Sequence, residues 1–289
     1  MSTILVTGAN GQLGNELRCL EKSFPKFSFV YTDYKELDIT NSDAVAKSLQ
    51  ETKALYLINC AAYTAVDKAE TEQDKAYLLN ADAPKILASE TKKACCKYIH
   101  ISTDYVFDGA AFIPYTEEQP IKPTSVYGNS KAMGETLAMQ ENPDCIIIRT
   151  SWLYSSFGNN FVKSMIRLGN ERNELGVVFD QVGSPTYARD LALGILQIVS
   201  KIEEGSKIWV SGIYHYSNEG VCSWYDFTKA IHKLKGITSC NVKPIESKEF
   251  PTPVKRPNYS VFNKKKIKST YDISIPYWYD SLIDCLALL

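Results

Sequence analysis

The chain has 289 residues, of which 45% are hydrophobic and 22% are charged, and its formal net charge at pH 7 is −1. This composition is ordinary for a globular protein, and the absence of a basic field argues against a nucleic acid as partner. No apolar run approaches the ~20 residues of a membrane span, which argues against a membrane partner. Residues 1–3 lead into an apolar run without a basic leader pattern, so we expect a cytoplasmic protein.

The eight cysteines and three histidines show no metal-binding pattern. No C-x-x-C pair occurs, and the adjacent Cys95 and Cys96 are poorly placed for a disulfide or a zinc site. His215 and His232 lack ligand spacing, and His100 lies in a predicted core strand, where we expect a satisfied buried histidine. We therefore predict reduced thiols and no catalytic metal.

Short apolar runs alternate with helix-compatible segments through the first half of the chain. The expected strands are residues 3–7, 27–32, 54–60, 97–102 and 145–150, and the expected helices are residues 12–20, 42–49, 81–91 and 124–140. Several apolar runs are unbroken, which is typical of strands covered on both faces. This alternation predicts an α/β fold with a Rossmann-like, doubly wound parallel sheet.

The pattern changes after about residue 150. Aromatic residues and prolines become frequent, and the expected elements are helices at 160–168, 188–199, 224–235 and 277–288 with a strand signal at 212–217. We interpret residues 1–150 as a dinucleotide-binding domain. Residues 151–289 would form mainly a smaller, mixed α/β substrate-binding lobe, with some segments crossing back to the sheet.

Small residues follow the first and third predicted strands. Gly8-Ala9-Asn10-Gly11-Gln12-Leu13-Gly14 stands between a strand and a helix, where glycines let the backbone approach a pyrophosphate at the positive helix end. Asn59-Cys60-Ala61-Ala62 would leave room for the nicotinamide half, although packing alone also explains small residues there. We expect NADPH or NADH as cofactor.

Acidic residues after the second predicted strand bear on the adenosine end of that cofactor. Asp33 would accept from the ribose hydroxyls, which favours NADH, while Lys35 leaves NADPH open. Capping of the next turn is the alternative for Asp33. Asp38 would accept from the adenine amine while Ile39 covers the ring, and N-capping of the following helix is an equal alternative.

Tyr127 and Lys131 stand four residues apart in a predicted helix, so their side chains leave the same face. Taken without the other motifs, Tyr127 and Lys131 could equally be an ordinary pair on the protein surface. An ammonium beside a phenol lowers the phenol pKa from ~10 toward the range of a general acid. Ser102 and Thr103 offer hydroxyls after a predicted strand. With a nicotinamide, Tyr127 would protonate a carbonyl oxygen that Thr103 binds, and Lys131 would bind the ribose.

Several motifs together resemble the extended short-chain dehydrogenases/reductases, and among them the dTDP-4-dehydrorhamnose reductases. The most specific are S-T-D-Y-V-F-D-G at 102–109, R-T-S-W at 149–152 and D-Q-x-G-x-P-T at 180–186. The others are the glycine turn at 8–14, residues 59–70, Y-G-N-S-K at 127–131, G-N-N-F at 158–161, and Arg256-Pro257.

The resemblance implies NAD(P)H-dependent reduction of the C4 keto group of dTDP-4-dehydro-6-deoxy-L-mannose, which gives dTDP-L-rhamnose for cell-surface polysaccharide. It implies that Thr103, Tyr127 and Lys131 are catalytic. Besides Tyr127 and Lys131, the implied cofactor contacts are Gly8, Asn10, Gly11, Gln12, Leu13, Gly14, Asp33, Asp38, Ile39, Ala61, Ala62, Tyr63 and Thr64. The implied substrate contacts are Val66, Thr103, Asp104, Tyr105, Trp152, Asn160 and Arg256.

Other functions on the same scaffold are considered too. Sister dehydratases carry an Asp-Glu pair where this chain has Asp104-Tyr105, so the base needed for dehydration is missing. The alternatives are a non-enzymatic dinucleotide-binding regulatory subunit, resembling the β subunit of methionine adenosyltransferase, and a reductase or epimerase of another nucleotide 4-ketosugar. A homodimer fits the resemblance. Arg189 precedes Asp190 where some relatives pair two acids around a bridging cation, so a cation-bridged dimer is not predicted.

Overall fold

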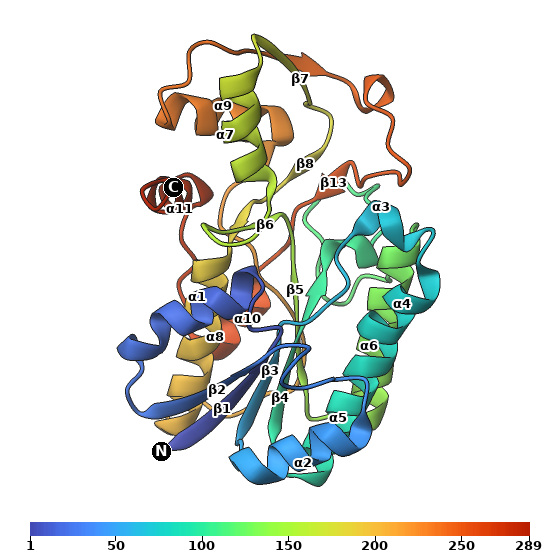
Figure 1. Cartoon of the computed structure of the whole chain (residues 1–289), viewed down its shortest axis with the longest axis vertical. Helices are drawn as coiled ribbons and strands as arrows, with labels where there is room; N and C mark the ends of the chain where they lie inside the picture. The colour runs from blue at the N-terminus through green and yellow to red at the C-terminus, as the bar shows by residue number, and fades with distance from the viewer.

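A six-stranded sheet forms the larger part of the structure, a computed structural model that describes all residues from 1 to 289 (Figure 1). Every strand pairing in this sheet is parallel. From edge to edge the strands are β10 (Gly212–His215), β5 (Ile146–Thr150), β4 (Lys97–Thr103), β3 (Tyr56–Asn59), β1 (Ser2–Thr7) and β2 (Phe27–Thr32). The predicted Rossmann-like, doubly wound fold is confirmed.

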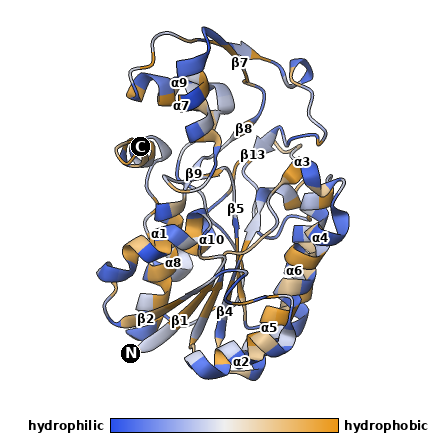
Figure 2. Cartoon of the chain, viewed as in Figure 1, coloured by the Kyte–Doolittle hydropathy of each residue, from blue (hydrophilic) through white to orange (hydrophobic).

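Helices cover both faces of the sheet. One face carries α1 (Gln12–Leu20), α8 (Ala188–Glu203) and α10 (Lys265–Tyr271), and the other carries α2 (Ser42–Thr52), α5 (Ala83–Lys93) and α6 (Val126–Glu141). Figure 2 shows that apolar residues gather in the central strands and polar residues on the outer sides of the helices. No helix combines the length and apolar character needed to cross a membrane.

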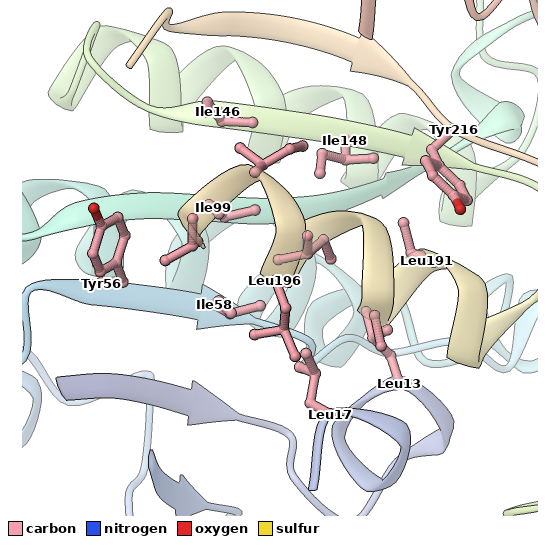
Figure 3. Close-up of a cluster of buried hydrophobic side chains, with 14 of the residues drawn as sticks. Leu13, Leu17, Tyr56, Ile58, Ile99, Ile146, Ile148, Leu191, Leu196 and Tyr216 are labelled. Carbon is pink, nitrogen blue, oxygen red and sulfur yellow. The ribbon is translucent and has the colours of Figure 1, made fainter. Parts of the chain in front are cut away.

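The side-chain alternation of the strands divides the core into two layers. Ile4 and Val6 of β1 pack toward α1 and α8, whereas Leu5 packs toward α2 and α5. Figure 3 shows the first layer, in which Ile148 of β5 and Leu191 of α8 belong to one buried cluster. Full burial of such a side chain contributes about 1.5–3 kcal/mol, and this is what holds the helices on the sheet.

A smaller lobe lies beyond the carboxyl ends of the sheet strands (Figure 1). Its strands form three small sheets: β11 (Cys222–Ser223), β8 (Val182–Gly183) and β13 (Tyr259–Ser260); β12 (Asn241–Ile245) with β7 (Glu174–Val178); and β6 (Leu153–Tyr154) with β9 (Thr186–Tyr187). Its helices are α7 (Phe161–Glu171), α9 (Trp224–Leu234) and α11 (Trp278–Leu286). They share a second core that contains Tyr154, Phe227 and Leu282.

The chain crosses between the two parts more than once. Residues of α8, β10 and α10 follow residue 150 but belong to the core of the large sheet. The sheet therefore draws on residues from both sides of the predicted boundary. The assignment of residues 151–289 to substrate binding stays a prediction.

The structure contains short helical segments that the sequence did not predict. They are η1 (Glu21–Ser23), α3 (Val66–Ala69), α4 (Gln73–Tyr77), the π-type turn η2 (Leu78–Asp82), η3 (Asp104–Val106) and η4 (Ser247–Glu249). Asn80, within η2, anchors this turn to the rest of the fold, because its side-chain amide accepts from the Tyr63 N–H and donates to the Tyr63 carbonyl oxygen. A Cβ at Gly134 would lie 2.0 Å from the Asn80 carbonyl oxygen, so only glycine allows α6 to approach this closely.

Candidate active site

The strand order reverses between β1 and β3, and the first cavity lies at this point. Ligands of open α/β sheets bind outside the carboxyl ends of the strands where the order reverses. A cavity of about 720 Å³ occupies this position. Of the predicted cofactor residues, those that line it are Gly8, Gly11, Asp33, Asp38, Ile39, Ala61 and Ala62.

Close backbone contact explains the glycine turn. Gly8 has φ +66°, and a Cβ there would lie 2.5 Å from the Ala61 nitrogen, so the turns after β1 and β3 touch. Gly11 precedes α1 and supplies no side-chain cap to its first N–H groups. These N–H groups and the positive end of the helix dipole can bind a pyrophosphate. The residues present therefore fit a dinucleotide.

The two acids of this cavity have structural partners. Asp33 accepts from the backbone nitrogens of Asn10 at 2.9 Å and Tyr34 at 2.8 Å, so it does support the turn, and its contact with the ribose stays a prediction. Asp38 accepts from the backbone N–H of Thr40 at 2.9 Å. The alternative that Asp38 caps the next helix is wrong, because Asn41 caps α2 through the Ala44 nitrogen.

The remaining predicted cofactor residues do not line the cavity: Asn10, Gln12, Leu13, Gly14, Tyr63, Thr64, Tyr127 and Lys131. Leu13 packs into the main core. Gln12 accepts from the Asn160 amide at 2.9 Å, which joins α1 to the segment before α7. Tyr63 donates its hydroxyl proton to Glu72 at 3.1 Å. Their contacts with a cofactor stay predictions.

A second cavity of about 480 Å³ is lined by residues of both lobes. Of the predicted substrate residues, Asp104, Tyr105, Trp152 and Arg256 line it, whereas Val66, Thr103 and Asn160 do not, and the substrate contacts of all seven stay predictions. Asn160 instead caps α7 by accepting from the Lys163 nitrogen at 3.2 Å.

Thr103 and Tyr127 are neighbours, next to Asp104, which lines the second cavity. The Thr103 hydroxyl donates to Asp104 Oδ1 at 3.0 Å, and its position beside the Tyr127 phenol lowers the pKa of that phenol against the larger, opposite effect of burial. Tyr127 is 8% exposed, and its ring meets that of Tyr105 edge-on with centroids 5.3 Å apart. Val66 packs against the same cluster. A substrate oxygen placed here would face a hydroxyl and a phenol together.

Lys131 does not lower the Tyr127 pKa in this structure. Burial raises that pKa, with a smaller contribution of the same sign from Asp104, which is the opposite of the predicted direction. The reason is geometric. The Lys131 Nζ donates to the Ile101 carbonyl oxygen at 2.7 Å and lies 3.4 Å from His100 Nε2, so it points toward the sheet.

The surroundings of Lys131 shift its own proton affinity. The side chain is 2% exposed, and burial lowers its pKa from the usual 10.5 to about 8, with the Glu135 charge acting in the opposite direction. His100 was predicted to be a satisfied core histidine, and its contact with Lys131 was not predicted. The residue spacing could have indicated this contact, because His100 and Ser102 share one face of β4, and Lys131 and Glu135 share one face of α6.

Asp104 carries an unsatisfied oxygen at the second cavity. Its Oδ2 is buried without a hydrogen-bond partner, and burial raises the pKa of the carboxyl to about 6. Arg256 pairs with Asp67 and donates to the Tyr105 hydroxyl at 3.3 Å. The cavity therefore offers an acid, a guanidinium and a phenol to a polar ligand.

Aromatic rings form another wall of the second cavity. Trp152 has φ +48° and stacks on Trp224 with ring centroids 3.5 Å apart and planes 8° apart. The Phe161 ring centroid lies 4.3 Å from that of Trp224. Trp152 is an expected substrate contact, but Trp224, which the sequence did not single out, covers one side of its ring. No sequence spacing links residues 152 and 224.

These features are those of a dinucleotide-binding oxidoreductase with a second, smaller lobe. A family model described as RmlD substrate binding domain matches residues 1–289. The dTDP-4-dehydrorhamnose reductase of Aggregatibacter actinomycetemcomitans is 41% identical over 98% of this chain and 97% of its own. The chain belongs to the dTDP-4-dehydrorhamnose reductase family.

Solved structures agree in fold. A dTDP-4-dehydrorhamnose reductase from Clostridium acetobutylicum has a TM-score of 0.91 and 44% identity, covering 99% of both chains. The Bacillus anthracis reductase in complex with NADP has a TM-score of 0.93 and 39% identity, covering 100% of both chains.

Proposed function

We propose that this chain reduces the C4 keto group of dTDP-4-dehydro-6-deoxy-L-mannose to give dTDP-L-rhamnose, with NADPH or NADH as reductant. Its family membership and the NADP complex of a relative support this proposal. The observation that carries it furthest is the meeting of Thr103, Asp104 and Tyr127 beside a cavity that both lobes line.

The cofactor would lie along the first cavity, with its pyrophosphate at the N-terminus of α1 and its adenosine toward Asp33 and Ile39. When bound, the reduced nicotinamide supplies a hydride. Gly8 and Ala61 both line this cavity, and neither position projects a large side chain into it. The choice between the two nicotinamide cofactors is open, and direct comparison decides it.

The chain's own residues would handle the proton. Tyr127 would donate its phenolic proton to the C4 oxygen as the alkoxide forms, and the Thr103 hydroxyl would bind that oxygen. Burial keeps Tyr127 protonated before the reaction, because it raises the phenol pKa. Lys131 would bind the nicotinamide ribose through its side-chain nitrogen.

The groups around Tyr105 favour reduction over dehydration. Dehydration of a hexose needs an acid and a base beside the ring. Tyr105 follows Asp104 here, and its hydroxyl accepts from Arg256, so no carboxylate stands at that position. A simple reductase is therefore the reaction that these residues support.

Location and assembly are proposals as well. All eight cysteines are free, as expected in a reducing compartment, and we propose that the enzyme works in the cytoplasm. A homodimer is proposed from the family resemblance alone, and light scattering of the purified chain decides it.

Nicotinamide absorbance tests the function. The 4-keto substrate is generated enzymatically and mixed with the chain and each reduced cofactor in turn. We expect rapid oxidation with at least one cofactor, and a loss of about 10²–10⁴-fold in kcat for Tyr127→Phe with unchanged cofactor affinity. Tyr279→Phe, on α11, is the matched control. No oxidation with either cofactor would overturn the proposal.

A further inference from the structure

The motif D-Q-x-G-x-P-T at residues 180–186 has no part in the proposed mechanism, yet it borders the second cavity. It runs from the turn after β7 through β8 to the start of β9. Gly183 leaves room for an indole, because a Cβ there would lie 2.6 Å from Trp152 Cε2. Gln181 is the member of the motif that lines the cavity, and it is only 7% exposed. A buried amide needs hydrogen-bond partners, so its contacts decide what it can bind.

Asp180 and Ser247 determine which way the Gln181 amide points. The Asp180 carboxylate accepts from the Ser247 nitrogen at 3.0 Å and from the Ser247 hydroxyl at 2.7 Å. A carboxylate can only accept, so the hydroxyl proton of Ser247 is used in this bond and its oxygen is left to accept another. Gln181 Nε2 lies 2.9 Å from that oxygen and must donate to it. The NH₂ group of Gln181 therefore faces Ser247, and this fixes the orientation of the amide.

The other end of the amide, Gln181 Oε1, is an unused acceptor. It accepts no hydrogen bond from the chain, and it is not one of the unpaired polar atoms that the protein encloses completely. An amide oxygen repels a phosphate oxygen and attracts an N–H or O–H group. Because Ser247 holds the NH₂ group, the amide cannot turn to exchange its two ends without losing that bond. The cavity wall therefore presents a fixed acceptor for an uncharged donor.

The charged groups of the cavity leave the nucleoside part of a nucleotide sugar for this acceptor. Arg256 is the only cation among the lining residues, and Asp67 and Asp104 are the only acids. An anionic diphosphate would be drawn to Arg256, whereas the keto group to be reduced would lie at Thr103 and Tyr127, beside Asp104. The remaining part of such a ligand is the nucleoside, whose donors are uncharged.

Apolar side chains surround the space that is left. Phe161, Met165, Val177 and Trp224 all line the same cavity as Gln181. Aromatic and aliphatic faces of this kind pack against a flat heterocycle but do not distinguish one base from another. Recognition in such a cavity depends on its few polar groups.

We propose that Gln181 is a specificity-determining residue of the second cavity, whose fixed Oε1 accepts a hydrogen bond from an uncharged donor of the nucleoside. A thymidine nucleotide has two donors of this chemistry, the N3–H of the base and the 3′-hydroxyl of the deoxyribose. The inference rests on the proposed function, because it takes a nucleotide as the ligand of this cavity. Gln181 has no part in the transfer of hydride or proton.

Binding of nucleotides to the unaltered chain tests the inference without turnover. Titration calorimetry compares dTDP with N3-methyl-dTDP and with 3′-deoxy-dTDP, each of which lacks one of the two donors. We expect one of these analogues to bind about tenfold more weakly than dTDP, because Oε1 then loses water without gaining a donor. Equal affinities for all three nucleotides, or no binding of dTDP, would overturn the inference whether or not any variant folds.

Gln181→Met separates the lost hydrogen bond from a change in ligand shape. Methionine is of similar length but has no amide oxygen, so this variant should bind dTDP about tenfold more weakly and should no longer distinguish dTDP from the weaker analogue. Thr252→Val is the matched control, because Thr252 lines the same cavity and donates its hydroxyl proton to the Val254 carbonyl oxygen at 2.6 Å. This control should keep the ratio of the two affinities. If Gln181→Met also keeps the full ratio, the analogue is rejected by its shape, and the inference is overturned.

The same proteins separate this inference from the proposed function. If neither reduced cofactor is oxidised, the proposed reduction fails, while a preference for dTDP that depends on Gln181 would still support the inference. If the ketosugar is reduced but all three nucleotides bind equally, the proposed function stands and the role of Gln181 is refuted.

Discussion

The buried ion pair between Glu135 and Arg149 allows a sharp stability prediction. Arg149 donates to Glu135 from Nε at 2.9 Å and from Nη2 at 2.7 Å, and Ser102 donates to the same carboxylate at 2.5 Å. The side chains are 2% and 3% exposed. Arg149→Met would leave the carboxylate buried with one partner.

The expected loss follows from that burial. Removing one member of a buried pair costs about 3–5 kcal/mol, because the remaining charge stays desolvated. Total stability is typically about 5–15 kcal/mol, so this single change would remove a large share of it. The double variant Glu135→Met with Arg149→Met removes both charges, and we expect it to recover most of the loss.

Urea denaturation at pH 7 measures both effects, with the midpoint and slope read for each variant. Arg167→Met is the control, because Arg167 pairs with Glu171 one helical turn away and the two side chains are 61% and 53% exposed. This exposed pair should contribute about 0.5 kcal/mol or less. A loss below about 1 kcal/mol for Arg149→Met, or a double variant as unstable as the single one, would refute the reasoning.

Two further predictions concern the cofactor turn and the buried lysine. Gly8→Ala should weaken NADPH binding by about tenfold or more in a fluorescence titration, because the new Cβ would lie 2.5 Å from the Ala61 nitrogen. Gly205→Ala is the control, because Gly205 has a similar φ of +69° but no neighbour within 4 Å of the added Cβ. Equal losses of binding in the two variants would contradict the contact argument. The Lys131 pKa of about 8 is below the usual 10.5, so the unfolded chain binds more protons between these values and stability should rise with pH there, by up to about 3 kcal/mol. The urea midpoints of the unaltered chain and of Lys131→Met, each measured at pH 7 and pH 10, test this rise. If the difference between the two proteins is the same at both pH values, the prediction is contradicted.

Local patterns predicted much of the fold. The helix predicted at 12–20 is α1 without change, because the glycine turn marks its start so clearly. The helix predicted at 81–91 begins two residues later as α5, since the residues before it form the π-type turn η2. That turn is anchored by Asn80 bonding Tyr63, a tertiary contact that no helical period encodes.

Part of the candidate site could be predicted from the order of strands and helices in the sequence. Thr103 follows a predicted strand and Tyr127 lies in the next predicted helix, and the two side chains are neighbours in the structure. The Tyr127 pKa direction was wrong, because the Lys131 amine points toward the sheet in the free protein. Trp224 was missed for a different reason: its contact with Trp152 joins segments far apart in the chain, and stacking depends on how the lobe folds.

Transfer of deuterium tests the central claim most directly. The chain is given the enzymatically generated dTDP-4-keto-6-deoxyhexose together with NADPH or NADH deuterated at C4 of the nicotinamide, and the product is examined by NMR. We predict dTDP-L-rhamnose with one deuterium at the sugar C4, and no product from Tyr127→Phe on the same timescale. Deuterium at any other carbon, or full activity of Tyr127→Phe, would contradict this account.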